Sequence, residues 1–297
     1  MTNNNKVILY IDILGFAALT EAYPIDIDLL KMRDRPLSRE HNIDKILAIP
    51  RNRLIDTFTS FHYSLAATLN LAKMSHPLTA ITFSDSAFIA TTYAYEAVNI
   101  AIDLLHALLP QKIPVRMGIA YGTFAALRFK SDIMSDGGDH AAQFLGTAIV
   151  RAHAAETCGI KGLRILLHPS LIPLFDDSRH NPGSTDGKHP IRYLECSERE
   201  RTNNKIGIHH EIDYWHLKPT READAWHAFQ DMWNEAPQSV YEHYEATAEA
   251  INRMRIAQGH EPLNNLRRRT LPRASRNLGK NVSRRFTNVY DKQKPKT

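Results

Sequence analysis

The chain has only two cysteines among its 297 residues, Cys158 and Cys196, and no long uninterrupted apolar run. Two cysteines cannot build a disulfide framework or a cysteine-rich metal site, so a reducing compartment is expected. The most apolar early stretch, residues 7–19, is broken by Asp12 and is too short to span a bilayer. Residues 1–6 are polar and lack the n-region of a signal peptide. These absences predict a soluble cytoplasmic protein that does not associate with membranes.

Two further features are missing. No glycine-rich phosphate-binding loop of either common kind is present. The regular strand–helix alternation of a doubly wound sheet is missing as well. The apolar fraction of 43% is nevertheless ordinary for a globular protein, so the chain can bury a core, and its length favours one or two domains.

Charge of one sign is gathered at the C-terminal end. The formal net charge is +5, but residues 253–297 hold 13 basic and 2 acidic residues, and the rest of the chain has a net charge of −6. Phe286 and Tyr290 lie among these cations, which makes nucleic-acid binding by the tail an alternative function. No recognised binding motif accompanies the tail, so nucleic acid is not the expected partner.

Apolar periodicity predicts an α+β sandwich with a mixed, mainly antiparallel sheet flanked by helices. Strands are expected at 7–11, 78–83, 87–92, 115–121, 163–167, 191–196 and 211–217, and helices at 17–22, 51–74, 94–109 and 141–157. Residues 84–86 are expected to form a hairpin turn, and 123–129 are expected to pair back on 115–121. The expected domain covers 1–218, with 23–50 as an insertion or lid. A helical extension over 219–259, with a break at Pro237, and a basic, flexible tail over 260–297 follow.

Two carboxylates occupy unusual positions. Asp12 ends an apolar strand, and Asp85 lies at the tip of the predicted hairpin. A carboxylate at the edge of a buried strand is costly unless it is paired, hydrogen-bonded or metal-bound. Two such groups on adjacent strand ends would form a hard-oxygen site suited to Mg²⁺ or Mn²⁺. The alternative is that Asp12 caps the following helix and that Asp85 is an ordinary turn residue.

Four segments, in order along the chain, resemble the signatures of class III nucleotide cyclases. They are Asp12–Phe16, Phe83–Ser86, Val115–Gly122, and Phe144–Gly146 followed by Ala148, Arg151, Ala152 and Glu156. The resemblance covers about 7–217 and is closest to the Pycsar pyrimidine cyclases of bacterial anti-phage defence. It implies a class III cyclase-like fold and conversion of UTP to 3′,5′-cyclic UMP and pyrophosphate. A cytidylate cyclase that makes cyclic CMP is the alternative.

The same resemblance implies roles for individual residues. Asp12, Asp85 and Arg116 would be catalytic, although Arg116 could instead form an ion pair at the strand edge. Two divalent cations, Mn²⁺ or Mg²⁺, would be held by Asp12, Asp85 and the backbone carbonyl of Ile13. The region of Phe16 would contact the triphosphate through its backbone.

The sequence departs from the purine cyclases at positions that read the nucleotide base in those enzymes. Ile81 and Gln143 stand where those enzymes carry a lysine and an acid that read the purine, which implies a different, pyrimidine-binding pocket. The asparagine and arginine of the helix after Gly146 are also missing, and Arg151 or Arg116 is the candidate substitute. Class III sites lie between two subunits, so a single copy of the motifs implies a head-to-tail homodimer with shared active sites.

Overall fold

The computed structural model describes residues 4–24, 52–73, 78–130, 140–182, 191–204, 206–216 and 219–263. The predicted insertion over 23–50 and the predicted tail over 260–297 lie almost wholly outside these residues. Within the described ranges, no helix combines the length and apolar character needed to cross a bilayer.

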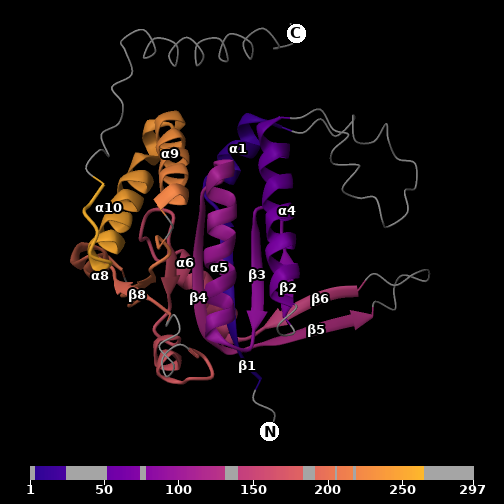
Figure 1. Cartoon of the computed structure of the whole chain (residues 1–297). Coiled ribbons are helices and arrows are strands. Elements are labelled where there is room, and N and C mark those ends of the chain that lie inside the picture. Colours follow the sequence, from indigo (N-terminus) through magenta and orange to yellow (C-terminus); the bar gives the residue numbers. More distant parts are fainter. Residues whose placement is uncertain are drawn as a thin grey trace, which may run out of the picture.

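The centre of the molecule is a seven-stranded sheet with the order β2-β3-β1-β4-β7-β9-β8 (Figure 1). Its strands are β1 (Asn5–Ile13), β2 (Thr79–Thr82), β3 (Ser86–Thr91), β4 (Val115–Thr123), β7 (Ile165–Leu167), β8 (Tyr193–Glu195) and β9 (His210–Ile212). Of the described pairings, β4 with β7 is parallel and the others are antiparallel. The predicted α+β fold with a mixed, mainly antiparallel sheet is confirmed.

Helices flank the sheet and extend the chain beyond it. They are α1 (Phe16–Ala22), α4 (Arg53–Lys73), α5 (Ala94–Leu108), α6 (Thr147–Glu156), α8 (Glu198–Asn203), α9 (Pro219–Glu235) and α10 (Tyr241–Ala257). Short 3₁₀ turns are η2 (Leu109–Gln111), η3 (Ile172–Asp176) and η4 (Gln238–Val240). Pro237 separates α9 from α10, so the predicted helical segment with a break at this proline is confirmed.

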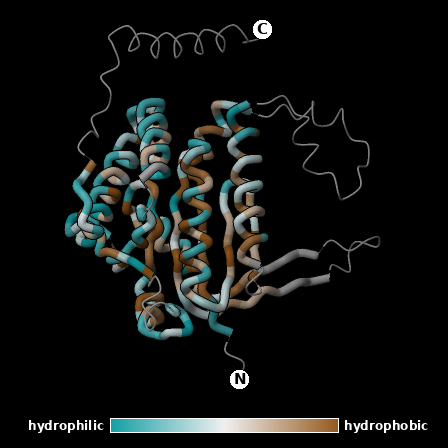
Figure 2. Tube along the Cα trace, viewed as in Figure 1, coloured by the Kyte–Doolittle hydropathy of each residue, from teal (hydrophilic) through white to brown (hydrophobic). Residues whose placement is uncertain are grey.

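Side-chain alternation along β1 decides which helices cover which face of the sheet. Val7, Leu9 and Ile11 point into the main core, which also contains residues of α4, α5, α9 and α10. Ile8 and Tyr10 point to the opposite face and pack with alanines of α6. Figure 2 shows apolar residues along these central strands and more hydrophilic ones on the outer helices. Asp12 continues the second series and therefore lies on the face that α6 covers.

Two glycines of β4 let α6 approach the sheet closely. A Cβ atom on Gly118 would collide with the carbonyl oxygen of Ala152, and one on Gly122 would collide with the hydroxyl of Thr147. The close approach places Glu156, the last residue of α6, over the beginning of β4.

Three predicted elements differ from the structure. The strand expected at 211–217 ends early, because β9 covers only His210–Ile212 and residues 213–216 are not in a strand. Residues 123–129 were expected to pair back on 115–121, but β5 (Ala125–Lys130) pairs with β6 (His140–Leu145) in a separate two-stranded sheet. β6 takes the first residues of the predicted helix 141–157, and α6 begins only at Thr147. The start of this segment is rich in alanine and carries no local strand signal, so pairing with β5 overrides the propensity.

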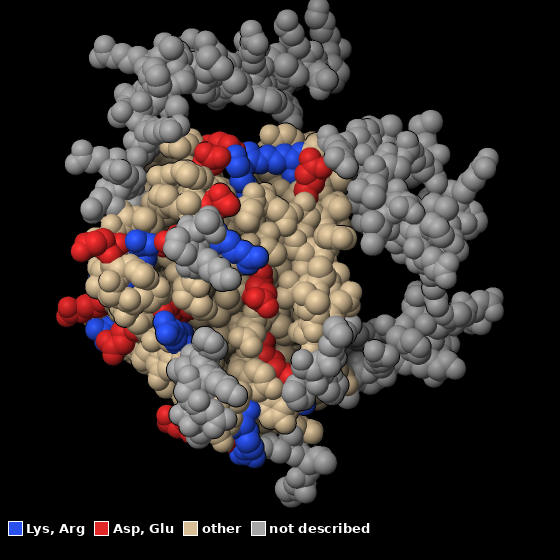
Figure 3. All heavy atoms as spheres, in the orientation of Figure 1, with Lys and Arg blue, Asp and Glu red and all other residues tan. Residues whose placement is uncertain are grey.

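Charged residues are scattered over one face of the body. On the face shown in Figure 3, basic and acidic side chains alternate over the surface instead of gathering into one basic patch.

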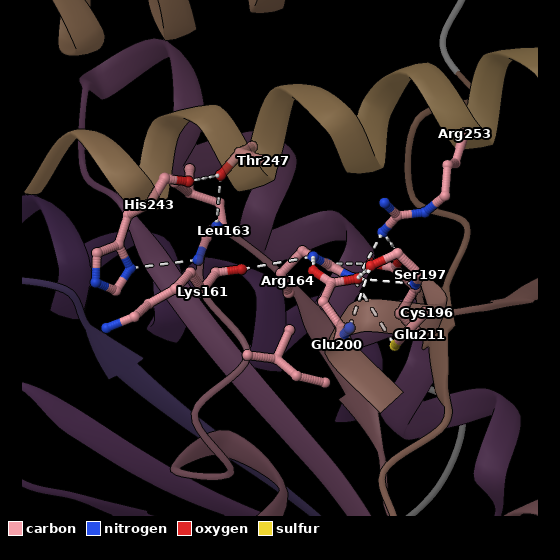
Figure 4. A network of polar contacts seen from close by, with 12 residues as sticks. Lys161, Leu163, Arg164, Cys196, Ser197, Glu200, Glu211, His243, Thr247 and Arg253 are labelled. Carbon is pink, nitrogen blue, oxygen red and sulfur yellow. Dashed lines mark hydrogen bonds and ion pairs between the residues drawn. The ribbon is translucent and has the colours of Figure 1, made fainter. Parts of the chain in front are cut away.

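A buried charge network joins α10 to the sheet. Arg164, which is 0% exposed, pairs with Glu211 of β9 and, at 2.7 Å, with Glu200 of α8 (Figure 4). Arg253 of α10 pairs with Glu211 at 2.9 Å and with Glu200 at 3.2 Å. Because α9 and α10 also contribute to the main core, these helices pack as part of the same body as the sheet.

Candidate metal and active site

The site begins at the C-terminal end of β1. Asp12 pairs in register with Ser86 of β3 on one side and with Arg116 of β4 on the other. Residues directly opposite one another in a sheet place their side chains on the same face. The run V-I-L-Y-I is buried on both faces of the sheet, and Asp12, which is only partly buried, follows it on the face of Ile8 and Tyr10.

Asp85 is brought to the same place by the β2–β3 turn. The backbone N–H of Phe83 donates to the carbonyl of Ser86 at 2.8 Å, which closes the turn. The N–H of Ile13 then donates to the carbonyl of Asp85 at 2.9 Å, so the turn is bonded directly to the end of β1. The hydroxyl of Ser84 donates to the carboxylate of Asp85 at 3.2 Å. The two predicted carboxylates are therefore neighbours.

Burial and neighbouring acidic groups act together on the pKa of Asp12. Burial raises the pKa of this carboxyl to about 7, and the nearby charges of Glu156 and Asp85 add to the effect. Arg116 and a hydrogen bond from Tyr10 act in the opposite direction but do not cancel it. Burial also raises the pKa of Tyr10 to about 12, so its hydroxyl stays protonated and available as a donor.

Arg116 is held by a partner on α6. Its Nε donates to Glu156 Oε1 at 2.6 Å, its second terminal nitrogen lies 2.5 Å from the same oxygen, and its Nη1 donates to the carbonyl of Ile160 at 3.2 Å. Glu156 is only 2% exposed. The structure thus forms the ion pair that was the alternative for Arg116, and a catalytic role for this residue stays a prediction.

The donor set fits a hard divalent cation. Asp12 and Asp85 supply carboxylate oxygens, and the carbonyl of Ile13 follows directly in the chain. Among the residues that the structure describes, no group of three or more histidine, cysteine, aspartate and glutamate side chains is placed to hold a metal. Two carboxylates are nevertheless enough for Mg²⁺, which is usually held by one or two carboxylates together with substrate phosphates and water.

Other predicted residues fall into two groups. Phe16 begins α1 directly after the site, with its side chain in the main core, and Ile81 lies on β2 opposite Phe88, itself the partner of Tyr10. These two lie near the carboxylates, whereas Gln143 and Arg151 do not.

Gln143 lies on β6, where only its backbone is described, and pairs with Leu127 of β5 beyond the far end of β4. Arg151 of α6 donates to the carbonyl of Tyr121 at 3.0 Å. Tyr121 is five residues along β4 from Arg116, roughly 17 Å at the usual rise of a strand. Within one chain, the structure therefore does not bring Gln143 and Arg151 together with the carboxylates.

Sequence reasoning gave no role to Tyr10 and did not find the contacts of Glu156. Glu156 carried a usable signal, because it continues the apolar stripe of Ala148, Ala152 and Ala155 on the buried face of α6. An acid on such a stripe needs a buried partner. Tyr10 gave no comparable signal, since an aromatic residue in an apolar strand is ordinary.

Neither a protein family model nor a curated protein matches this chain. Solved structures similar to it include a bacterial light-regulated adenylyl cyclase, with 12% identity over 77% of this chain and a TM-score of 0.45; the chain spans 57% of that protein. The guanylate cyclase domain of RhGC from Catenaria anguillulae in complex with GTP is 12% identical, with a TM-score of 0.45 over 70% of this chain and 95% of that one. The adenylyl cyclase CyaB from P. aeruginosa is 14% identical, with a TM-score of 0.39 over 70% and 92%. Because these TM-scores lie below 0.5, the function is inferred from the geometry of the site.

Proposed function

We propose that this chain is a nucleotide cyclase that converts UTP to 3′,5′-cyclic UMP and pyrophosphate. The observation that supports this most strongly is the pair Asp12 and Asp85, joined at adjacent strand ends where acidic charge exceeds basic charge. A site of this kind gains stability from divalent cations, and a nucleoside triphosphate arrives with such cations bound to its phosphates.

Asp12, Asp85 and the carbonyl of Ile13 would hold two divalent cations, Mg²⁺ or Mn²⁺. When bound, such ions neutralise charge on the α-phosphate and the leaving pyrophosphate and favour ionisation of the 3′-hydroxyl. The 3′-oxygen attacks the α-phosphorus, the bond to the β-phosphate oxygen breaks, and the hydroxyl proton leaves to solvent. The chain itself supplies orientation: Tyr10 lies beside Asp12 and acts on its carboxyl, and the turn at Asp85 is fixed to β1.

A second copy of the chain would complete the site. Gln143 and Arg151 lie beyond or beside the far end of β4 from Asp12, so one chain cannot present all of these residues to one small substrate. A head-to-tail homodimer would bring the Arg151 end of one copy to the Asp12 end of the other and create two sites. In this arrangement Arg151 is the candidate to stabilise charge on the phosphates, since Arg116 already holds Glu156.

The preference for a pyrimidine rests on Ile81 and Gln143, which replace a lysine and an acid of the purine cyclases. Ile81 cannot donate to a purine ring nitrogen, and an amide offers a donor and an acceptor in place of a carboxylate. Cyclic CMP from CTP is the runner-up product. Signalling in anti-phage defence in the cytoplasm is part of the proposal and is supported by the sequence resemblance alone.

Product analysis tests the proposal. Purified protein is incubated with each of the four ribonucleoside triphosphates and Mn²⁺, and the products are separated. We expect a cyclic pyrimidine product, and a loss of turnover of about 1,000-fold or more in Asp12→Ala and Asp85→Ala. Asp103→Ala, which removes an exposed carboxylate on α5, is the matched control and should retain full turnover.

Folding of each variant is checked by its thermal unfolding transition. Absence of any cyclic product from a fully folded protein would contradict the proposal, and a cyclic purine product would overturn the pyrimidine preference. Gel filtration tests whether the chain is a dimer. Mixing Asp12→Ala with Arg151→Ala tests whether the two copies share a site: a mixed dimer retains one intact site, so activity should reappear in the mixture.

A further inference from the structure

The turn that carries Asp85 is exposed and lies at an edge of the sheet. β2 is the last strand on this side of the sheet, and its described pairing is with β3. Phe83 is 48% exposed, and Ser84 is exposed as well. An exposed turn on an edge strand has few packing contacts that could hold it in place. A carboxylate on such a turn needs other restraints if its distance to a second carboxylate is to stay fixed.

Helix α4 supplies such a restraint from outside the sheet. It lies beside β2 and β3 (Figure 1), and His62 on this helix reaches the turn. The Nε2 atom of His62 lies 3.3 Å from the backbone carbonyl of Ser84, the residue directly before Asp85. A carbonyl oxygen can only accept, so Nε2 carries the ring proton and donates the hydrogen bond. The contact joins residues 22 positions apart and links the turn to a helix that packs in the main core.

The His62 ring is held by two phenylalanines of the same helix. Its centroid lies 4.3 Å from that of Phe58 and 5.1 Å from that of Phe61, which is fully buried. Burial lowers the pKa of His62, and the backbone carbonyls of Phe83 and Ser84 oppose this effect without cancelling it. The ring is therefore a neutral donor. Unlike a lysine or an arginine, it would not repel divalent cations bound close to the turn.

We propose that His62 is a positioning residue for the metal site: its hydrogen bond fixes the carbonyl of Ser84, so that the carboxylate of Asp85 keeps its place beside Asp12. His62 itself would contact neither cation. This inference rests on the proposed role of Asp85 as a metal ligand and adds a residue that lies outside the sequence motifs. Groups that support a metal ligand through hydrogen bonds commonly change metal affinity by about 10- to 100-fold when they are removed.

The test uses two variants that separate the donor from the ring. His62→Phe keeps an aromatic ring beside Phe58 and Phe61 but removes the N–H, whereas His62→Gln keeps an N–H at a similar reach. His106→Phe is the matched control, because the Nε2 atom of His106 contacts the carbonyl of Tyr214 at 2.8 Å in another part of the fold. An unfolding transition confirms that each variant is folded, and His62→Leu, which also lacks a donor, replaces His62→Phe if the latter does not fold.

Two measurements on the full chain do not require turnover. Electron paramagnetic resonance of free Mn²⁺ gives the metal affinity in the absence of nucleotide. Hydrogen exchange gives the protection of the Ile13 amide, which donates to Asp85. We expect His62→Phe to weaken Mn²⁺ binding about tenfold and to speed exchange at Ile13 severalfold. His62→Gln should stay within about threefold of the wild type in both measurements, and His106→Phe should change neither.

Turnover of UTP separates a positioning role from a general loss of structure. In His62→Phe the Mn²⁺ concentration at half-maximal rate should rise about tenfold, while kcat at saturating Mn²⁺ should fall less than about twofold. A lower kcat with an unchanged Mn²⁺ requirement would overturn the inference.

The two turnover-independent measurements decide the remaining outcomes. The inference is overturned if His62→Phe leaves Mn²⁺ affinity or exchange at Ile13 unchanged, or if His62→Gln or His106→Phe changes them as much. It is also overturned if the wild type binds no Mn²⁺. A wild type that binds Mn²⁺ but forms no cyclic product would contradict the proposed function alone, and a weaker Mn²⁺ affinity in His62→Phe would then still support the positioning role.

Discussion

The molecule contains two clusters of buried charge that are balanced in opposite ways. Around Arg164, two arginines meet two glutamates, and each charge has a partner. Around Asp12, the three carboxylates of Asp12, Asp85 and Glu156 lie near one cation, Arg116. Arg116 is already paired with Glu156. The first cluster is complete without any ligand. The second is not, although both are built from the same kinds of side chain on the same sheet.

The pKa values express this difference. In the first cluster burial works to raise the pKa of Glu200, but the charge and hydrogen bond of Arg164 outweigh burial and lower it to about 2. In the second, burial and neighbouring acids together raise the pKa of Asp12 to about 7. A cluster whose charges satisfy one another holds a fold together, whereas a cluster that lacks positive charge leaves room for cations.

The largest expected change in the free energy of unfolding comes from the cluster around Arg164, which we call the balanced cluster. Arg164→Met should lower the free energy of unfolding by about 3–5 kcal/mol, because Glu211 is then left buried without a full counter-charge. Urea unfolding of the purified protein measures the change. Arg199→Met, on the exposed face of α8, should change it by less than about 0.5 kcal/mol. Adding Glu211→Gln to Arg164→Met should recover part of the loss. A loss below about 1 kcal/mol for Arg164→Met would show that Arg164 and its partners do not stabilise the fold.

Neutralising Asp12 should change the free energy of unfolding in the opposite direction. In metal-free protein Asp12→Asn should raise the free energy of unfolding at pH 8, by about 1–2 kcal/mol once the partial exposure of the carboxyl is allowed for. The folded-state pKa lies above the unfolded one, so the folded protein holds the proton more tightly. Stability of the wild type therefore falls as the pH rises from about 4 to about 7, and the gain in the variant should vanish near pH 4.

Unfolding at several pH values in the presence of EDTA measures this difference. Asp103→Asn is the control, and its small effect should not depend on pH in this way. A variant less stable than the wild type at pH 8 would mean that the Asp12 cluster is balanced after all.

The sequence predicts most of what is local. The apolar run from Val7 to Ile11, the hairpin and the two carboxylates at strand ends are patterns of neighbouring residues, and the structure places the carboxylates side by side. Their role as metal ligands stays a prediction, since it concerns a group that binds from outside.

What the sequence does not predict depends on packing between distant segments. The contact of Arg116 with Glu156 joins residues 40 positions apart and requires α6 to lie close on Gly118. The strand β6 forms because β5 is available to pair with it, in a segment whose alanines favour a helix. Arg164 did carry a signal, because a charge between Leu163 and Ile165 interrupts an apolar strand, but its partners come from β9, α8 and α10.

A smaller effect is expected on the pKa of Asp12 within the acidic cluster, which consists of Asp12, Asp85, Glu156 and Arg116. Glu156→Gln removes the second-largest influence that raises the pKa of Asp12 and frees Arg116 to turn toward Asp12. The pKa of Asp12 should fall by about one unit and remain above the ordinary value, because burial, the largest influence, persists. Carbon-13 NMR of the carboxyl in metal-free protein measures it. Glu198→Gln, on the exposed surface of α8, should leave it unchanged, and an unchanged value in Glu156→Gln would remove Glu156 from the cluster.

The smallest effect concerns a thiol inside the balanced cluster. Burial, together with the charge of Glu211, raises the pKa of Cys196 to about 12, and an Arg164 nitrogen donates to its sulfur at 3.8 Å. In a Cys158→Ser background, Cys196 should react with a disulfide reagent at pH 8 about 100-fold more slowly than in the unfolded chain. Arg164→Met should speed this reaction severalfold, since loss of the network lets the segment open. Asp12→Asn should not change it, because the acidic cluster lies on other strands; equal acceleration by both variants would mean that the two clusters open as one unit.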